Sequence, residues 1–275
     1  MQKNIQADVA RALEEDVGSG DITAHLIPVS AQATADVISR EQAVICGVDW
    51  FNEVFHQLDK TISIEWKVTD GTSVNNNELL CTLTGSARNI LTGERAALNF
   101  LQTLSGTATL AHLYAEQVKG TTTKILDTRK TIPGLREAQK YAVKCGGCDN
   151  HRHGLYDGIL IKENHITAAG SIEAAIQQAK QQNASLPIEV EVETLQQVEI
   201  ALNAGADILL LDNMSANDIQ QAVAMNNGKA KLEVSGGVSL EKIPQLAQTG
   251  VDFISVGALT KHVRAIDLSM RFINN

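Results

Sequence analysis

The sequence has too few cysteines for a disulfide framework, and it has no long apolar run. Four cysteines stand among 275 residues, whereas secreted domains that depend on disulfides carry many cysteines in a short chain. No apolar run approaches the roughly 18 residues that a membrane-spanning helix needs. The opening residues, MQKNIQADVARALEEDVGSGD, are typical of a polar amphipathic helix and not of a signal peptide. These features predict a protein of the reducing cytoplasm with no membrane partner.

Positive charge is also scarce, except in one segment. The chain has 23 Lys and Arg against 32 Asp and Glu, a net charge of −9. This balance argues against general binding of nucleic acid, which selects basic surfaces. Residues 124–165 are the exception, with eight Lys or Arg, five Asp or Glu and three histidines. Several of these cations follow apolar, strand-like runs, so we expect them to face a small ligand that carries several negative groups.

The second half alternates between short β-branched runs and helical periodicity, a pattern typical of βα units around a parallel sheet. Six or seven units fit an α/β barrel or a doubly wound sheet, and both folds place ligands at the carboxyl ends of the strands. Ser171, Thr194 and Ser239 stand where helix N-caps are expected. The expected strands cover 124–128, 157–162, 188–193, 207–212, 231–236 and 252–257, and the expected helices cover 171–182, 194–205 and 239–250.

The first hundred residues have a different pattern. Strand-like stretches such as TISIEWKV and ELLCTLTG alternate with turn signals, and a helix with an apolar stripe is expected from about Arg88 past Leu101. We therefore predict an α+β domain over residues 1–108, joined by the C-terminal segment 265–275, and a βα domain over residues 109–264.

Three groups of cations follow expected strands or a turn. Arg129 and Lys130 come after ILDT, His151 and Arg152 follow a glycine-rich turn, and Lys162 ends the run GILIK. Arginine binds a carboxylate or phosphate through two hydrogen bonds, and lysine adds a point charge. A buried lysine stem also favours an anionic partner. The alternative is that these side chains are ordinary surface cations in solvated turns.

Carboxylates line one face of the expected strand IEVEVE. Strand alternation puts Glu189, Glu191 and Glu193 on the same side, and such a row needs cations or a metal ion if it is buried. Asp212 ends the next strand, and carboxylates on adjacent strands suit Mg²⁺ shared with a polyphosphate. An edge strand with one solvated face is the alternative.

Glycine-rich turns follow the last two expected strands. Ser235, Gly236 and Gly237 follow KLEV, and Gly257 follows FISV. Backbone N–H groups in such turns can bind phosphate, and the position late in the domain matches the usual phosphate site of βα barrels.

Cys145 and Cys148, with His151 and His153, form the main competing signal. The set offers four zinc ligands, but it crowds them into nine residues, whereas structural zinc sites usually separate their two ligand pairs by about a dozen residues. We interpret the segment as a glycine-rich turn, with a zinc- or thiol-based binding protein as the alternative.

Taken in order, several long motifs resemble the quinolinate phosphoribosyltransferase family. The resemblance runs over nearly the whole chain, and it rests on GDITA at 20–24, GERAALNFLQTLSG at 93–106, DTRKTIPGLR at 127–136, NHRHGLYDGILIKENH at 150–165, EVEVET at 189–194, LLLDN at 209–213 and SGGV at 235–238.

The resemblance implies a reaction, a fold and an assembly. The reaction joins quinolinate to phosphoribosyl pyrophosphate with Mg²⁺ and gives nicotinate mononucleotide, pyrophosphate and CO₂, a step of NAD synthesis. The implied fold is an N-terminal α/β sandwich with an incomplete, seven-stranded α/β barrel. Family members are dimers or assemblies of dimers in which the N-terminal domain of one subunit covers the barrel mouth of the other.

Residue roles follow from the matching motifs. The resemblance implies that Glu191 and Asp212 face the ribose and Mg²⁺, and that Lys130 and Lys162 stand near the reacting centre. The implied quinolinate set is Arg129, His151, Arg152 and Lys162, with Arg95 from the partner subunit. The implied phosphoribosyl pyrophosphate set is Lys130, Glu191, Asp212, Ser235, Gly236, Gly237 and Gly257.

Two points stay open within the resemblance. A related protein of the same fold could act on another carboxylated heterocycle or be linked to molybdate transport. In addition, Cys148 stands where many family members have a third glycine, and a positive φ angle there would strain the turn.

Overall fold

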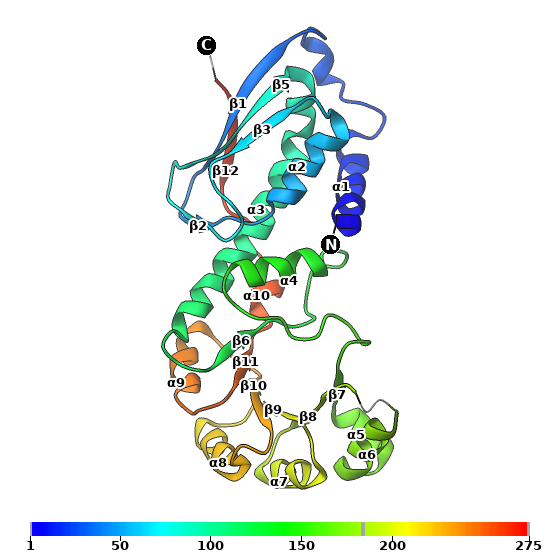
Figure 1. The fold of residues 1–275 in the computed structure, drawn as a ribbon, viewed down its shortest axis with the longest axis vertical. Coiled ribbons are helices and arrows are strands. Elements are labelled where there is room, and N and C mark those ends of the chain that lie inside the picture. Colours follow the sequence, from blue (N-terminus) through cyan, green and yellow to red (C-terminus); the bar gives the residue numbers. More distant parts are fainter. Residues whose placement is uncertain (1, 183–184, 274–275) are drawn as a thin grey trace. The chain divides into compact units, whose positions relative to one another are not determined.

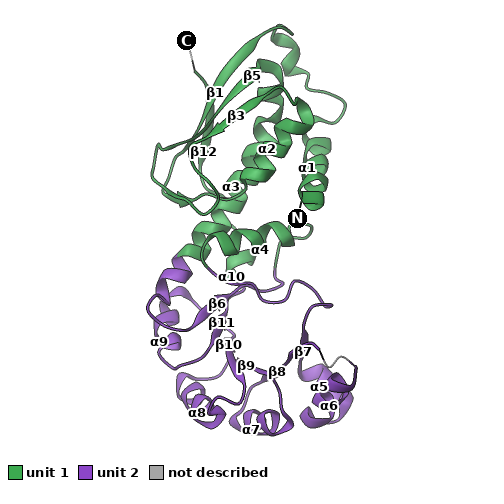
Figure 2. Cartoon of the chain, in the orientation of Figure 1, with its two compact units in different colours: residues 1–112, 131–147, 258–275 green, residues 113–130, 148–257 purple. Residues whose placement is uncertain are grey.

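A computed structural model describes residues 2–182 and 185–273 of the chain. Figure 1 shows a mixed α/β protein, as the sequence predicts. The chain forms two compact units (Figure 2). Unit 1 comprises residues 1–112, 131–147 and 258–275, and unit 2 comprises residues 113–130 and 148–257. Residues 131–147 and 258–264, assigned by the expected bounds to the barrel, group with unit 1.

An antiparallel sheet forms one layer of unit 1, with helices as the second layer (Figure 1). Its strand order is β12-β1-β5-β3, and the C-terminal strand pairs with β1 through Ala35 and Phe272. The C-terminal segment therefore joins the N-terminal sheet. The strands of unit 1 are β1 (Gln32–Ser39), β2 (Ala43–Val44), β3 (Ser63–Trp66), β4 (Ser73–Val74), β5 (Leu79–Ser86) and β12 (Leu268–Phe272).

Aromatic residues of the helical layer fill the core of unit 1. Trp50, Phe51 and Phe55 are buried on α2, and Asp70 holds the start of that helix by accepting the N–H groups of Gly47 and Val48. The helices of unit 1 are α1 (Gln2–Val17), η1 (Thr23–Leu26), α2 (Val48–Leu58), α3 (Ala87–Gln117), α4 (Arg136–Cys145) and α10 (Ala258–Lys261), of which α3 continues past the unit at His112.

Gly106 lets the C-terminal segment approach helix α3 closely. A Cβ atom at this position would overlap the carbonyl oxygen of Arg264, and Ile266 donates its N–H to the carbonyl of Gln102 one turn earlier. We expect Gly106→Ala to lower the free energy of unfolding by about 1–3 kcal/mol, because backbone and not a flexible side chain must move. Denaturant unfolding followed by circular dichroism measures the change. The exposed helical variant Asn99→Ala is the control, and equal stability of both variants would contradict the prediction.

A parallel sheet forms the inside of unit 2. Its strand order is β6-β11-β10-β9-β8-β7, and a parallel bridge between Leu126 and Asp149 adds a seventh segment beside β6. The curved sheet in Figure 1 thus agrees with the expected incomplete barrel. Its strands are β6 (Lys124–Leu126), β7 (Ile159–Ile161), β8 (Ile188–Val192), β9 (Ile208–Asp212), β10 (Lys231–Ser235) and β11 (Phe253–Ser255).

Helices cover the outside of this sheet (Figure 1). Thr194 caps α7 by accepting the N–H of Gln197, and Gly205 ends that helix at a φ of 78°. Ser239 is not a side-chain cap: the expected helix at 239–250 is reduced to two short turns. The helices are α5 (Glu163–Ala169), α6 (Ile172–Gln182), α7 (Leu195–Ala204), α8 (Ala216–Asn226), η2 (Leu240–Lys242) and α9 (Ile243–Ala247). Among the described residues, no helix combines the length and the apolarity needed to cross a bilayer.

Candidate active site

A cavity of about 560 Å³ opens at the carboxyl ends of the parallel strands of unit 2. Parallel strands bring their carboxyl ends to one edge, so residues far apart in sequence meet there. The predicted site residues on its wall are Arg129, Lys130, His151, Arg152, Lys162, Glu191, Asp212 and Ser235. The wall also contains Thr128, Leu155, Leu160, His165, Leu210, Glu233 and Ser255, which the predicted site set lacks.

The segment after β6 carries Arg129 and Lys130. The N–H of Lys130 donates to Thr128 Oγ1 at 3.1 Å, which turns the chain at the strand end. Gly257 lies against the Lys130 side chain, and a Cβ atom there would stand 3.1 Å from Lys130 Cδ. The absence of a side chain at Gly257 therefore leaves room for the lysine, so two predicted phosphate-binding residues are neighbours.

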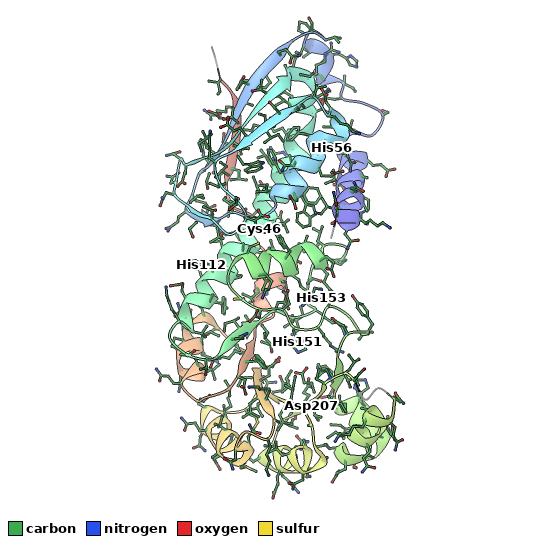
Figure 3. All side chains as sticks on the ribbon, viewed as in Figure 1. Cys46, His56, His112, His151, His153 and Asp207 are labelled. Atoms are coloured by element: carbon green, nitrogen blue, oxygen red, sulfur yellow. The ribbon has the colours of Figure 1, made fainter. Side chains whose placement is uncertain are left out.

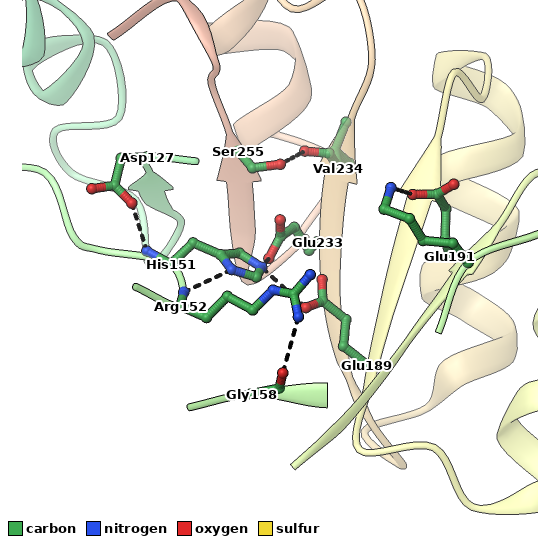
Figure 4. A network of polar contacts seen from close by, with 10 residues as sticks. Asp127, His151, Arg152, Gly158, Glu189, Glu191, Glu233, Val234 and Ser255 are labelled. Atoms are coloured by element: carbon green, nitrogen blue, oxygen red, sulfur yellow. Dashed lines mark hydrogen bonds and ion pairs between the residues drawn. The ribbon is translucent and has the colours of Figure 1, made fainter. Parts of the chain in front are cut away.

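Two aspartates shape the loop that presents Arg152. Asp127 accepts the N–H of His151 at 2.9 Å, and Asp157 accepts the N–H groups of His153 and Gly154. The guanidinium of Arg152 donates to the carbonyl of Gly158 at 3.0 Å (Figure 4). Burial, followed by the charge of Arg129, lowers the pKa of Arg152. Two arginines are thus held close together on one side of the cavity.

Lys162 forms an ion pair with Glu191 across strands β7 and β8. The lysine side chain is 47% exposed and that of Glu191 is 12% exposed, so the expectation that the strand buries the Lys162 stem is wrong in the single chain. Lys162 stands at the N-cap of α5, where its own N–H donates to His165 Nδ1 at 3.0 Å. Because the strand ends one residue earlier, the side chain projects from the rim.

Asp212 and the glycine turn after β10 form an adjoining part of the site. Asn213 donates its side-chain N–H to Asp212 Oδ2 at 2.8 Å and its backbone N–H to the carbonyl of Ser235. Gly236 has a φ of 90°, and a Cβ atom there would overlap the Asn213 side chain. Gly237 follows with a φ of 57°. The turn thus needs glycine both for conformation and for its close approach to Asn213.

Two buried glutamates, Glu189 and Glu233, lie beside His151. Neither belongs to the predicted site set, although Glu189 stands in the expected row of carboxylates. His151 Nε2 lies 3.0 Å from Glu189 Oε2 and 3.5 Å from Glu233 Oε2 (Figure 4). The alternation that places Glu189 and Glu191 inward on β8 applies equally to Glu233 and Ser235 on β10, so this signal was present in the sequence. Glu193 lies beyond β8 and is exposed.

The cysteine signal does not form the four-ligand zinc site. His151 and His153, both labelled in Figure 3, belong to unit 2 together with Cys148, whereas Cys145 ends α4 in unit 1. A hydrogen bond with Cys145 raises the pKa of Cys46 well above its usual range. Neither group of three potential metal ligands found among the described residues contains Cys148 or His153. Cys148 also has no positive φ, so it does not strain the turn.

Arg95 is exposed on helix α3 in unit 1. Its neighbour Glu94 is half-buried, and burial raises the pKa of this carboxyl group. The residues that line the cavity described above all belong to unit 2. The role of Arg95 in the cavity of a partner subunit, which the resemblance implies, stays a prediction.

The curved parallel sheet and its cation-rich cavity with two carboxylates at the rim define an α/β protein that is suited to binding small polyanions. Family models for the N-terminal and C-terminal domains of quinolinate phosphoribosyl transferase match residues 21–105 and 107–271. The chain therefore belongs to the quinolinate phosphoribosyl transferase family, as the resemblance of its motifs predicts.

Curated relatives and solved structures agree with this family. The chain is 41% identical over 272 residues to the nicotinate-nucleotide pyrophosphorylase of Mycobacterium leprae, covering 95% of each protein. It is 40% identical over 257 residues to a probable nicotinate-nucleotide pyrophosphorylase of Bacillus subtilis, covering 93% of this chain and 89% of the relative. The solved nicotinate-nucleotide pyrophosphorylase of Francisella tularensis superposes with a TM-score of 0.97 at 49% identity, covering 99% of this chain and 97% of that one.

Proposed function

We propose that this chain transfers the phosphoribosyl group of phosphoribosyl pyrophosphate to quinolinate and releases pyrophosphate and CO₂. The product is nicotinate mononucleotide, and the step belongs to NAD biosynthesis. One observation carries the proposal: the cations and the carboxylates that these two substrates require line a single cavity of unit 2. The full-length similarity to nicotinate-nucleotide pyrophosphorylases supports it. The cytoplasmic location that the sparse cysteines predict stays part of this proposal.

Arg129, Arg152 and Lys162 are the residues we assign to quinolinate. The two guanidinium groups can each bind a carboxylate through paired hydrogen bonds, and the lysine adds a point charge at the rim. Arg152 is held by Gly158 and Arg129 follows a buried strand, so little side-chain freedom is lost on binding. A flat dicarboxylate ring would be held at two points, which fixes its nitrogen.

Glu191 and Asp212 are the residues we assign to Mg²⁺ and the ribose. They stand on the adjacent strands β8 and β9 and line the same cavity. Mg²⁺ is commonly held by one or two carboxylates together with water and substrate phosphate, so this oxygen donor set fits the ion. When bound, Mg²⁺ supplies positive charge to the pyrophosphate leaving group. Of the proposed phosphate-binding residues, Ser235 ends β10, and Lys130, Gly236, Gly237 and Gly257 lie on the turns that follow neighbouring strands.

The chemistry needs position and charge more than a nucleophile on the protein. Departure of pyrophosphate leaves positive charge on the ribose carbon, and the Glu191 and Asp212 carboxylates can stabilise that charge. Holding the pyridine nitrogen in line with this carbon removes an entropic barrier. Once the nitrogen is alkylated, its positive charge stabilises the carbanion that loss of CO₂ leaves on the adjacent ring carbon.

We also propose a homodimer in which Arg95 of one subunit completes the quinolinate site of the other. Ile22, Leu26 and Val29 support the existence of an interface, because these apolar side chains are 86%, 84% and 76% exposed in the single chain. Large apolar side chains that are this exposed and this close together in the chain favour a protein contact. The Arg95 side chain, exposed on α3, is then free to enter a neighbouring cavity.

The substrate is tested by offering quinolinate and nicotinate separately with phosphoribosyl pyrophosphate and Mg²⁺. We expect turnover of quinolinate with release of CO₂, because a site with two arginines and a lysine is built for two carboxylates and binds one poorly. The nucleotide product is followed by chromatography and the CO₂ by isotope release. Turnover of nicotinate alone would support the alternative, a related protein acting on another carboxylated heterocycle, and would refute the proposed reaction.

A further inference from the structure

Two cysteines that lie far apart in the sequence meet inside unit 1. Cys46, labelled in Figure 3, directly precedes the N-cap of α2, and Cys145 is the last residue of α4. Their Sγ atoms and a carboxylate oxygen of Asp70 all lie within 4.8 Å of one another. The structure describes all four cysteines of the chain, and none of them is in a disulfide. Cys46 and Cys145 are therefore a reduced dithiol pair.

Backbone contacts hold the two cysteine segments together. The N–H of Gly71 donates to the carbonyl of Ile45, next to the first cysteine, at 2.8 Å. A Cβ atom at Gly71 would stand 3.5 Å from the carbonyl oxygen of Cys145, so the same turn touches both segments. A Cβ atom at Gly146 would overlap the carbonyl oxygen of Ala108 on α3. The main chain around Cys145 is thus packed in place beside the first cysteine.

The aspartate beside the dithiol pair is engaged in capping a helix. Asp70 Oδ1 accepts the N–H groups of Gly47 and Val48 at 2.9 and 3.1 Å, and its Oδ2 accepts the hydroxyl group of Tyr141 at 2.8 Å. A carboxylate away from bulk water needs such partners. These hydrogen bonds account for Asp70 as the cap of α2, so the two thiols are the groups of the cluster that need an explanation.

The two thiols differ in exposure and in acidity. Cys46 is fully buried, whereas Cys145 is partly exposed. A hydrogen bond with Cys46 lowers the pKa of Cys145, against the effect of burial, and the same hydrogen bond raises the pKa of Cys46. The thiolate and not the thiol is the nucleophile. Cys145 is therefore the thiol that a small reagent from solvent meets first, and Cys46 is the thiol placed to react with it afterwards.

We propose that the dithiol pair is a peroxide-sensitive modification site, in which Cys145 is oxidised first and Cys46 then closes a reversible disulfide. The Cys145 thiolate attacks one oxygen of hydrogen peroxide, the O–O bond breaks, and Cys145 becomes a sulfenic acid as hydroxide leaves. Cys46 loses its proton and attacks the Cys145 sulfur, which releases a second hydroxide. Two electrons have then passed from the thiols to the peroxide, and the two hydroxides with the two thiol protons form water.

The disulfide has two physical consequences. A sulfenic acid without a partner thiol is open to further, irreversible oxidation, whereas a disulfide is reduced again by thiols, so Cys46 protects Cys145. The disulfide also links the start of α2 to the end of α4, which restricts the unfolded chain and stabilises the folded one. Disulfides of cytosolic proteins are usually transient and redox-sensing, and a pair that closes only on oxidation agrees with the proposed cytoplasmic location.

The test treats reduced, full-length protein with hydrogen peroxide, blocks the remaining thiols by alkylation and maps the peptides without reduction. We expect a linked peptide pair that contains Cys46 and Cys145 and that separates after treatment with dithiothreitol. The midpoint of thermal unfolding should rise by about 4–16 °C on oxidation, the shift expected for the typical stabilisation by one disulfide. In Cys46→Ala, dimedone should trap a sulfenic acid at Cys145, and peroxide should no longer raise the midpoint.

Cys81→Ala is the matched control. Cys81 is another fully buried cysteine of unit 1, on β5, and burial raises the pKa of its thiol. The variant makes the same chemical change as Cys46→Ala but leaves the dithiol pair intact. It should therefore form the same linked peptides as wild type and show the same rise in the unfolding midpoint.

Several outcomes would overturn the inference. A link between Cys145 and Cys148 would make the C-x2-C segment the site of oxidation instead. No link in wild type, or a link that lowers the unfolding midpoint, would show that the pair does not close in the native fold. One bound metal ion per purified chain, lost in both Cys46→Ala and Asp70→Asn, would make the cluster a metal site. None of these measurements uses quinolinate, so the proposed reaction is tested separately.

Discussion

Lys162→Ala and Glu191→Ala each lower turnover of quinolinate by about 10²-fold or more, the loss expected for a group that stabilises developing charge in a preorganised site. The two side chains form an ion pair at the cavity rim in the protein without substrate. In the proposed reaction, the lysine turns to a substrate anion and the carboxylate to the ribose. Steady-state kinetics with both substrates varied measures the change in kcat and in each KM.

A second ion pair of unit 2 supplies the control. Lys231 Nζ lies 2.6 Å from Asp252 Oδ1, at the opposite ends of the strands from the cavity. Exposed pairs of this kind contribute about 1 kcal/mol or less to stability. Lys231→Ala should therefore fold and turn over like wild type. If Lys162→Ala behaved like Lys231→Ala, Lys162 would be a surface cation, and near-normal rates for Glu191→Ala would remove the carboxylate from the reaction.

Conservative variants separate charge from shape at the same positions. Glu191→Gln keeps the size of the side chain but loses the negative charge, so it should be almost as slow as Glu191→Ala if the carboxylate acts electrostatically. Lys162→Ala and Glu191→Ala each remove one side of the same ion pair. The double variant Lys162→Ala/Glu191→Ala should therefore lose less activation free energy than the sum of the two single losses.

The strands and the inward row of carboxylates were predictable because side-chain direction alternates strictly along a strand. The six expected runs all contain observed strands, with ends that differ by a few residues. The same rule reaches Glu233, yet a single glutamate between Lys231 and Ser235 gave no contrast against an ordinary exposed position. Glu233 is distinguished by its burial beside Glu189 and His151, which only the folded sheet brings near.

Other properties of the site depend on contacts that sequence spacing does not record. The run GILIK suggested a buried lysine, but β7 ends at Ile161 and Lys162 is left on the rim. The C-x2-C spacing left a ligand group open as the alternative to a glycine-rich turn; α4 ends at Cys145, and the chain turns after it and enters unit 2 at Cys148. Local pattern therefore predicted the elements, while the pairing of side chains across elements required coordinates.

The functional role of Arg95 follows neither from the sequence pattern nor from the structure of a single chain. It is exposed on α3 beside a half-buried glutamate, which fits an ordinary helix surface equally well. Its proposed role rests on the family and on the exposed apolar side chains of residues 22–29. An experiment on assembly is therefore needed to distinguish these readings.

Mixing two inactive chains restores activity if the active site is shared. Arg95→Ala removes the cation donated to the partner, and Lys162→Ala disables a subunit's own cavity, so each homodimer has two defective sites. A mixed dimer has one site with both defects and one site with neither. In a two-fold dimer, the purified mixed dimer should therefore recover about half of the wild-type rate, and an unfractionated random mixture about a quarter.

The subunits are exchanged by co-expression with two different tags, and the doubly tagged dimer is purified before assay. Its size is checked by light scattering, and its rate is compared with each parent variant and with wild type. The matched control replaces Lys162→Ala with Glu191→Ala in the mixture, which should give the same recovery because Glu191 also acts in its own subunit's cavity.

Mixed dimers no more active than their parents would place Arg95 in the cavity of its own chain. A monomeric, fully active wild-type protein would remove the shared site altogether. Recovery would show that the negative charge of quinolinate is met by cations from two chains, so that the free energy of assembly and that of substrate binding are linked.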